Sequence, residues 1–147
     1  MALILVADDD ETIREALYEF LSEEHRCQTA ETAEEALALL EAQPFDLVLT
    51  DISMPGVSGL ELLGHSRQKY PDIPVIIISG IADKAHAEGL IKIGAFDYLL
   101  KPFRLENVEK SVKRALEYRR QLLARSESGS GKGQEIASDW EILNEGS

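Results

Sequence analysis

Five short runs, most of them apolar, alternate with five longer stretches of helical spacing along this chain. The runs are five or six residues long, which is too short for helices, and most are rich in Val, Ile and Leu, as buried strands are. They cover residues 2–7, 26–30, 45–50, 75–79 and 96–100. The helical stretches cover residues 11–24, 32–43, 58–69, 83–93 and 105–124.

This alternation predicts an α/β fold in which helices cover both faces of a parallel sheet. Five strand–helix units favour a flavodoxin-like (βα)5 doubly wound parallel sheet with strand order 2-1-3-4-5. Sheets of this kind place their chemistry at the carboxyl ends of the strands, near the switch point between the first and third strands.

Several polar residues stand where helix ends are expected. Asp10 is a predicted N-cap, and Thr32 with Glu35 has the spacing of a capping box. Ser58 is a third candidate cap, and Gly94 is a predicted helix stop.

Length and composition fit one globular domain followed by a tail. The 147 residues are 44% hydrophobic and 29% charged, which is ordinary for a globular protein. We expect the domain to cover residues 1–124. Residues 125–147 read as a flexible Ser/Gly linker and acidic tail, or as the start of an output region. Within it, residues 138–143 suit one docking helical turn, although a disordered terminus is the favoured interpretation.

The sequence offers no membrane or secretion signal. No apolar run approaches 18 residues, and no basic leader with a cleavage site begins the chain. Cys27 is the single cysteine, so an internal disulfide is excluded and a reducing, cytoplasmic location is expected.

The net charge of −12 is unevenly distributed. Residues 1–100 carry 19 acidic against 6 basic side chains, whereas residues 101–125 carry 8 basic against 3 acidic. An acidic body argues against direct nucleic-acid binding by this domain. The basic stretch is either a partner surface or a solvated helix face.

Acidic, hydroxyl or basic residues stand at the carboxyl ends of four of the predicted strands. Asp8 and Asp9 follow the first strand, Asp51 the third, Ser79 ends the fourth and Lys101 follows the fifth. Acids brought together there repel each other, by about 4 kcal/mol for one pair near 4 Å at an effective dielectric of 20. A Mg²⁺ ion removes that cost.

This set suits phosphoryl transfer. Asp51 can attack phosphorus as a carboxylate nucleophile, while Lys101 and Ser79 suit the phosphoryl oxygens. Singly, each residue has a simpler interpretation: a helix cap for the acids, a turn for the serine, a surface charge or chain reversal for the lysine. Only the combination at one sheet edge points to chemistry.

Over about residues 2–124 the chain resembles the CheY-like receiver domains of two-component response regulators. Four motifs carry the resemblance: Val-Ala-Asp8-Asp9, Asp51-Ile-Ser-Met-Pro-Gly-Val-Ser-Gly59, Val75-Ile-Ile-Ile-Ser79-Gly80 and Gly94-Ala-Phe-Asp-Tyr-Leu-Leu-Lys101-Pro102-Phe103.

The resemblance implies a role for each site residue. It implies that Asp51 is the phosphoacceptor and that Mg²⁺ is held by Asp8, Asp9, Asp51 and the Ser53 backbone carbonyl, with Asp8 acting through water. It further implies that Ser79 is the switch hydroxyl, Lys101 the phosphate-sensing cation and Tyr98 the rotating aromatic. A cis peptide between Lys101 and Pro102 is also expected.

A sensor histidine kinase or histidine phosphotransfer protein is the phosphoryl donor that the resemblance implies. Phosphorylation would reshape the surface formed by residues 83–93, 96–100 and 105–124, which is also a candidate homodimer contact. Ser53 and Ile81 stand at positions thought to tune phosphoryl lifetime in this family. Neither carries an amide or carboxylate, so we expect a persistent acyl phosphate.

Three other functions compete with this interpretation. A phosphatase of the haloacid-dehalogenase type would need a second acid two residues after Asp51, where Ser53 stands. A flavodoxin would need a phosphate loop after the first strand, where the chain has acids. A receiver that docks partners without phosphorylation stays open, although the complete acid–serine–lysine set argues against it.

Overall fold

The computed structural model describes residues 1–54, 56, 59–80 and 84–127, in which five strands and five helices alternate. The elements are β1 (Leu3–Ala7), α1 (Glu11–Leu21), β2 (Arg26–Ala30), α2 (Ala33–Ala42), β3 (Leu47–Asp51), α3 (Gly59–Lys69), β4 (Val75–Ser79), α4 (Lys84–Lys92), β5 (Asp97–Leu100) and α5 (Leu105–Glu127).

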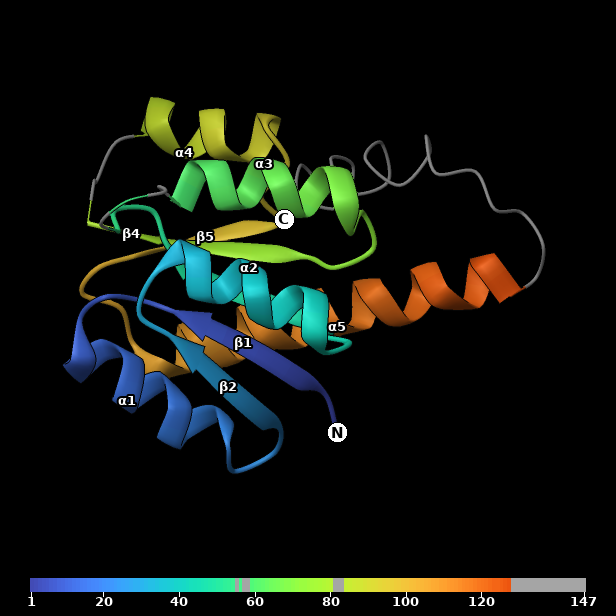
Figure 1. The fold of residues 1–147 in the computed structure, drawn as a ribbon, viewed down its shortest axis with the longest axis horizontal. Helices are drawn as coiled ribbons and strands as arrows, with labels where there is room; N and C mark the ends of the chain where they lie inside the picture. Colours follow the sequence, from blue (N-terminus) through green and yellow to red (C-terminus); the bar gives the residue numbers. More distant parts are fainter. Residues whose placement is uncertain (55, 57–58, 81–83, 128–147) are drawn as a thin grey trace.

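All five strands form one parallel sheet in the order β2-β1-β3-β4-β5 (Figure 1). The predicted flavodoxin-like (βα)5 topology is therefore confirmed. In this order β1 and β3 lie side by side although a whole strand–helix unit separates them in the sequence. Their carboxyl ends are consequently neighbours at one edge of the sheet.

The sheet buries its two faces against different helices. Alternate strand residues such as Leu5, Val48 and Ile77 pack in one apolar cluster with residues of α2, α3 and α4. The intervening residues, among them Ile4 and Leu49, pack in a second cluster with α1 and α5. Since consecutive side chains of a strand point to opposite faces, these continuous aliphatic strands supply both cores.

Asp10 and Thr32 are the N-caps of α1 and α2, as predicted. The Asp10 side chain accepts hydrogen bonds from the Thr12 and Ile13 N–H groups at 2.9 and 3.3 Å. Thr32 accepts from the Glu35 N–H at 3.1 Å, but the Glu35 carboxylate accepts from the Glu31 N–H rather than from that of Thr32. The reciprocal bond of a capping box is thus displaced by one residue.

Ser58, the predicted cap at the start of α3, lies outside the described residues. Gly94, the predicted stop after α4, has φ = +115°, a conformation that residues with a Cβ rarely adopt.

The last helix is longer than predicted. It reaches Glu127, so the first three residues assigned to the flexible linker are helical. The physical reason is that the first glycine after Leu105 is Gly129, and no residue from 125 to 127 breaks a helix. The final turns of α5 project past the sheet (Figure 1).

Arg119 connects α5 to residues that precede the amino-terminal ends of β3 and β4. Its guanidinium donates to the Asp46 carboxylate at 3.0 Å and to the Asp72 carbonyl at 2.9 Å. The second Asp46 carboxylate oxygen accepts from the Leu3 N–H at 2.9 Å.

Among the helices of the described residues, none combines the length and the apolar character that a membrane span requires.

Candidate functional site

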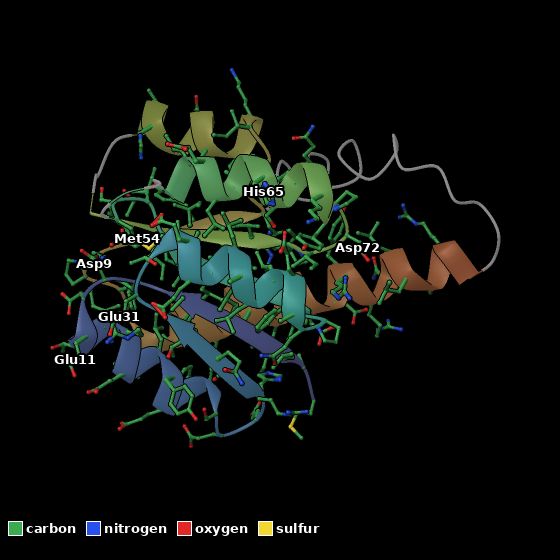
Figure 2. The ribbon with its side chains drawn as sticks, viewed as in Figure 1. Asp9, Glu11, Glu31, Met54, His65 and Asp72 are labelled. Carbon is green, nitrogen blue, oxygen red and sulfur yellow. The ribbon has the colours of Figure 1, made fainter. Side chains whose placement is uncertain are left out.

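Three carboxylates meet where β1 and β3 end. Asp51 is the last residue of β3, and Asp8 and Asp9 directly follow β1. One carboxylate oxygen from each of the three lies within 4.8 Å of the others. Figure 2 shows Asp9 in the loop after β1. The structure therefore brings together the three acids that the sequence placed at the strand ends.

Lys101 directly follows β5, and its side chain reaches this cluster. Its ammonium nitrogen lies 3.2 Å from Asp51 Oδ2 and 3.4 Å from Asp8 Oδ2. Burial alone would lower the pKa of Lys101, but the charges of Asp8 and Asp51 outweigh it, and the pKa is raised. Lys101 is therefore held as a cation between two acids.

Asp8 is the most enclosed of the acids, with 0% of its surface exposed. Burial raises its pKa and the charge of Asp51 adds to that effect, while the Asp10 N–H and Lys101 act in the opposite direction. Losing water around a carboxylate next to another carboxylate is unfavourable. Additional positive charge at this position would therefore be stabilising.

Main-chain N–H groups hold one carboxylate oxygen of Asp8 and one of Asp51. Asp8 Oδ1 accepts from the Asp10 N–H at 2.8 Å, and Asp51 Oδ1 accepts from the Ser53 N–H at 3.2 Å. Within the described residues, the buried Asp8 Oδ2 accepts no hydrogen bond, and its contact with Lys101 is a longer ion pair. Three hard oxygen donors, one of them incompletely satisfied, fit a Mg²⁺ ion.

Ser79 and Tyr98 lie on the adjacent strands β4 and β5. Ser79 ends β4, is fully buried, and its carbonyl accepts from the Lys101 N–H at 2.7 Å. Tyr98 lies in β5 opposite Ile77 and packs against the core on the α2–α4 side. The peptide bond between Lys101 and Pro102 is cis. Ile81 lies outside the described residues.

Arg14 is a residue near the site that the sequence interpretation missed. It donates from Nη1 to the Asp8 carbonyl at 2.9 Å. A signal was present: Arg14 precedes the buried Leu17 and Leu21 by three and seven residues, so it belongs to the inward stripe of α1. A cation at such a position must find an acceptor.

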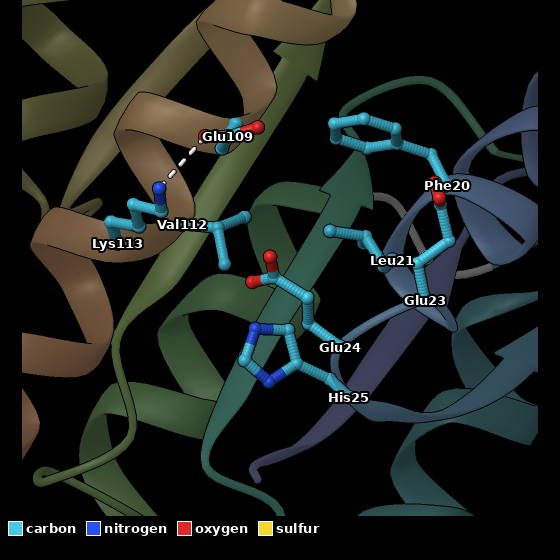
Figure 3. Close-up of a pocket in the computed structure, with 8 residues that line it drawn as sticks. All are labelled: Phe20, Leu21, Glu23, Glu24, His25, Glu109, Val112 and Lys113. Carbon is cyan, nitrogen blue, oxygen red and sulfur yellow. Dashed lines mark hydrogen bonds and ion pairs between the residues drawn. The ribbon is translucent and has the colours of Figure 1, made fainter.

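A separate pocket lies between the end of α1 and α5 (Figure 3). It is lined by apolar side chains such as Phe20 and Val112 and by the ion pair of Glu109 with Lys113, whose charged atoms are 2.8 Å apart. None of the predicted site residues lines it. The pocket is therefore distinct from the acidic cluster.

Several curated relatives of this chain are transcriptional regulators. It is 38% identical over 117 residues to the hydrogenase transcriptional regulatory protein HoxA of Cupriavidus necator, which covers 79% of this chain and 24% of HoxA. It is 39% identical over 117 residues to the DNA-binding transcriptional regulator NtrC of Salmonella typhimurium, covering 79% and 25%. The chain thus spans about a quarter of the length of these relatives.

Solved structures superpose on most of this chain. A response regulator receiver domain protein from Clostridium thermocellum superposes with a TM-score of 0.77 at 32% identity, covering 84% of this chain and 99% of that one. NtrX from Brucella abortus, in complex with ATP, superposes with a TM-score of 0.80 at 36% identity, covering 85% and 29%.

A sequence model of the response regulator receiver domain matches residues 4–113, which include all the predicted site residues. This match favours the receiver interpretation over the phosphatase and flavodoxin alternatives. Receiver domains are signalling switches, and they bind Mg²⁺ through an acidic cluster of the kind formed by Asp8, Asp9 and Asp51. The chain belongs to the receiver domain family of two-component response regulators.

Proposed function

We propose that this domain is a phosphorylation-driven switch in which Asp51 accepts a phosphoryl group in a Mg²⁺-dependent reaction. The donor is a sensor histidine kinase or a histidine phosphotransfer protein. The observation that carries the proposal is the arrangement around Asp51: two further carboxylates within 4.8 Å and the Lys101 ammonium at 3.2 Å.

The chain's own residues divide the work of the transfer. An Asp51 carboxylate oxygen attacks phosphorus, the phosphorus–nitrogen bond of phosphohistidine breaks, and its electron pair returns to the imidazole nitrogen. Lys101, already beside Asp51 Oδ2, neutralises charge on the phosphoryl oxygens. The Ser53 N–H holds Asp51 Oδ1 and so fixes the direction of the carboxylate.

Asp8, Asp9, Asp51 and the Ser53 carbonyl are the proposed Mg²⁺ ligands. When bound, the ion supplies charge neutralisation for the carboxylates and the phosphoryl oxygens. The incompletely satisfied, buried Asp8 Oδ2 supports this assignment.

Phosphorylation then changes the surface formed by α4, β5 and α5. New charge-assisted bonds draw Ser79 and Lys101 toward the phosphoryl group, and Tyr98 turns into the space that Ser79 leaves. Tyr98, Leu100 and Phe103 line a shallow pocket on this surface, so its shape depends on the tyrosine. Moving the balance of two states from 1:99 to 99:1 takes about 5.5 kcal/mol.

We propose that the same surface contacts an output partner or a second copy of the domain. HoxA and NtrC are described as transcriptional regulators, and this chain corresponds to part of such proteins. With 19 acidic against 6 basic residues in its first 100, the domain itself is not the part that binds nucleic acid. A cytoplasmic location and a domain covering residues 1–124, with α5 continuing to Glu127, complete the proposal.

Intact-mass measurement after incubation with acetyl phosphate and Mg²⁺ tests the proposal. We expect one phosphoryl mass on the wild-type chain and none on Asp51→Asn or in excess EDTA. The label should decay slowly, because Ser53 presents no amide or carboxylate to an attacking water. Absence of label with every donor would leave the phosphorylation-independent docking module as the function. Multiple turnover of phosphate esters would instead indicate a phosphatase.

A further inference from the structure

Arg14 is almost enclosed although it lies on the first turn of α1. Its side chain is 12% exposed. Nη1 donates to the Asp8 carbonyl at 2.9 Å, and Nη2 lies 3.3 Å from Glu31 Oε1. Glu31 is 67% exposed, and an ion pair with so exposed a partner contributes little. The bond to the main chain is therefore the principal contact of Arg14.

The Asp8 carbonyl needs such a donor because of its place in the chain. β1 ends at Ala7, and the Asp8 N–H still continues the ladder to β2 by donating to the Ala30 carbonyl at 3.1 Å. Asp8 itself is fully buried, so water does not reach its carbonyl. A buried carbonyl without a partner is unfavourable, and the guanidinium of Arg14 removes that cost.

This carbonyl belongs to the peptide unit that joins the two consecutive cluster acids. The unit is planar, so fixing the Asp8 carbonyl also fixes the plane from which Asp9 departs. The Asp8 carboxylate is held separately by the Asp10 N–H. Arg14 thus restrains the orientation of Asp9 relative to Asp8 without contacting either carboxylate.

We propose that Arg14 is a positioning residue for the cation site, holding the Asp8–Asp9 peptide so that both carboxylates face one ion. The inference rests on the proposed function, because it concerns the Mg²⁺ site of the same cluster. Figure 2 places Glu31 and Asp9 at the same end of the molecule, the end to which Arg14 is tied.

Arg119 provides a closely matched control. It is 14% exposed, it donates from Nη1 to a main-chain carbonyl at 2.9 Å, and it pairs with carboxylates, all as Arg14 does. Its partners Asp46 and Asp72 precede β3 and β4, whereas the acidic cluster follows β1 and β3. Truncating either arginine removes the same kind of contact, but only one truncation disturbs the cluster.

The experiment measures cation binding directly on the complete 147-residue chain. Free Mn²⁺ is followed by electron paramagnetic resonance, and Mg²⁺ is titrated by calorimetry. We expect Arg14→Ala to lower the affinity for both cations about tenfold. We expect Arg119→Ala to bind them as wild type does, although both variants lose thermal stability. Arg14→Lys should recover part of the affinity, since an ammonium also donates to a carbonyl.

Labelling by acetyl phosphate gives an independent readout. Arg14→Ala should need about tenfold more Mg²⁺ for its half-maximal rate and should approach the wild-type rate at saturating Mg²⁺. If Arg14→Ala does not fold, Arg14→Lys gives the same test with a smaller loss in the same direction.

Wild-type affinity in a folded Arg14 variant, or an equal loss in Arg119→Ala, would overturn the inference and leave the proposed function intact. Failure of the wild-type chain to bind either cation would overturn both.

Discussion

The ammonium nitrogen of Lys101 lies 3.2 Å from Oδ2 of Asp51, with 22% of the lysine side chain exposed. Fifty residues separate the two in the sequence, and β4 stands between their strands in the sheet. This ammonium places a positive charge against both buried acids, Asp8 and Asp51.

Replacing Lys101 with Met should therefore destabilise the metal-free protein. Two buried carboxylates would lose their counter-charge, at a cost of about 2 kcal/mol, less than for a fully enclosed pair because Lys101 is partly exposed. Urea unfolding in EDTA measures the loss. Mg²⁺ should then stabilise the variant more than it stabilises wild type. Equal unfolding midpoints in EDTA would contradict the ion-pair role.

Replacing Asp8 with Asn should have the opposite effect. The change removes a buried charge that repels Asp51 and keeps the side-chain shape, so metal-free stability at neutral pH should rise by about 1 kcal/mol. Added Mg²⁺ should stabilise the variant little. The matched control is Asp10→Asn, because asparagine caps a helix about as well as aspartate and the residue is exposed. A destabilised Asp8→Asn protein would show that the Lys101 pairing outweighs the repulsion.

Gly59 allows α3 to approach the end of β3, which carries the proposed acceptor Asp51. A Cβ at this position would meet the Asp51 carbonyl and lie 2.6 Å from the Ile52 Cα, both of them backbone atoms. Gly59→Ala should therefore cost about 2 kcal/mol of stability and slow labelling of Asp51, because the strand end must shift.

Gly64, in the same helix, has open space around it, and Gly64→Ala should gain about 0.5 kcal/mol through helix propensity. Thermal unfolding and acetyl-phosphate labelling of the two variants compare these effects. Similar behaviour of the two alanine variants would exclude a close-packing requirement at Gly59.

Tyr118 supplies a prediction about pH. It is 5% exposed and packs against Phe96 with ring centroids 5.6 Å apart. Burial raises its pKa to about 12, while Arg67 and Arg125 oppose the rise. Absorbance of phenolate at 295 nm should show one of the four tyrosines titrating well after its ordinary pKa of 10.0, and Tyr118→Phe should remove that late step.

The consequence for stability has a definite sign. Between pH 10 and 12 the unfolded chain releases the Tyr118 proton and the folded chain retains it, so this residue's contribution is complete below pH 10 and is lost as the pH rises toward 12. The loss amounts to about 3 kcal/mol at most. Tyr118→Phe should lose less stability over this interval than wild type does.

Much of the fold was predictable because these strands are buried on both faces and their helices are strongly patterned. An aliphatic run such as Val75–Ser79 is best interpreted as a buried strand when such runs alternate with amphipathic helices along the chain. The strand ends then brought Asp8, Asp51 and Lys101 together through topology alone. The roles of Ser79 and Tyr98 remain predictions that phosphorylation experiments must test.

What the sequence did not reveal depends on contacts between distant residues. Arg14 and Arg119 each donate to a main-chain carbonyl, and a carbonyl has no signature in the sequence. Both arginines do lie on the buried stripes of their helices, beside Leu17 and Leu122. A cation at a core position is a signal that a fixed acceptor exists, although it does not say which one.

The alternation of β3 between the two cores has a consequence for how reliably the proposed acceptor, Asp51, is placed. Leu47, Leu49 and Asp51 share one side of this strand, and Val48 points to the other. A slip of one residue would exchange these sides, expose aliphatic side chains to the wrong helices and withdraw the acid from its lysine. A misregistered chain would thus be both poorly packed and inactive. Cellular quality control that removes unstable proteins would also remove the copies unable to signal.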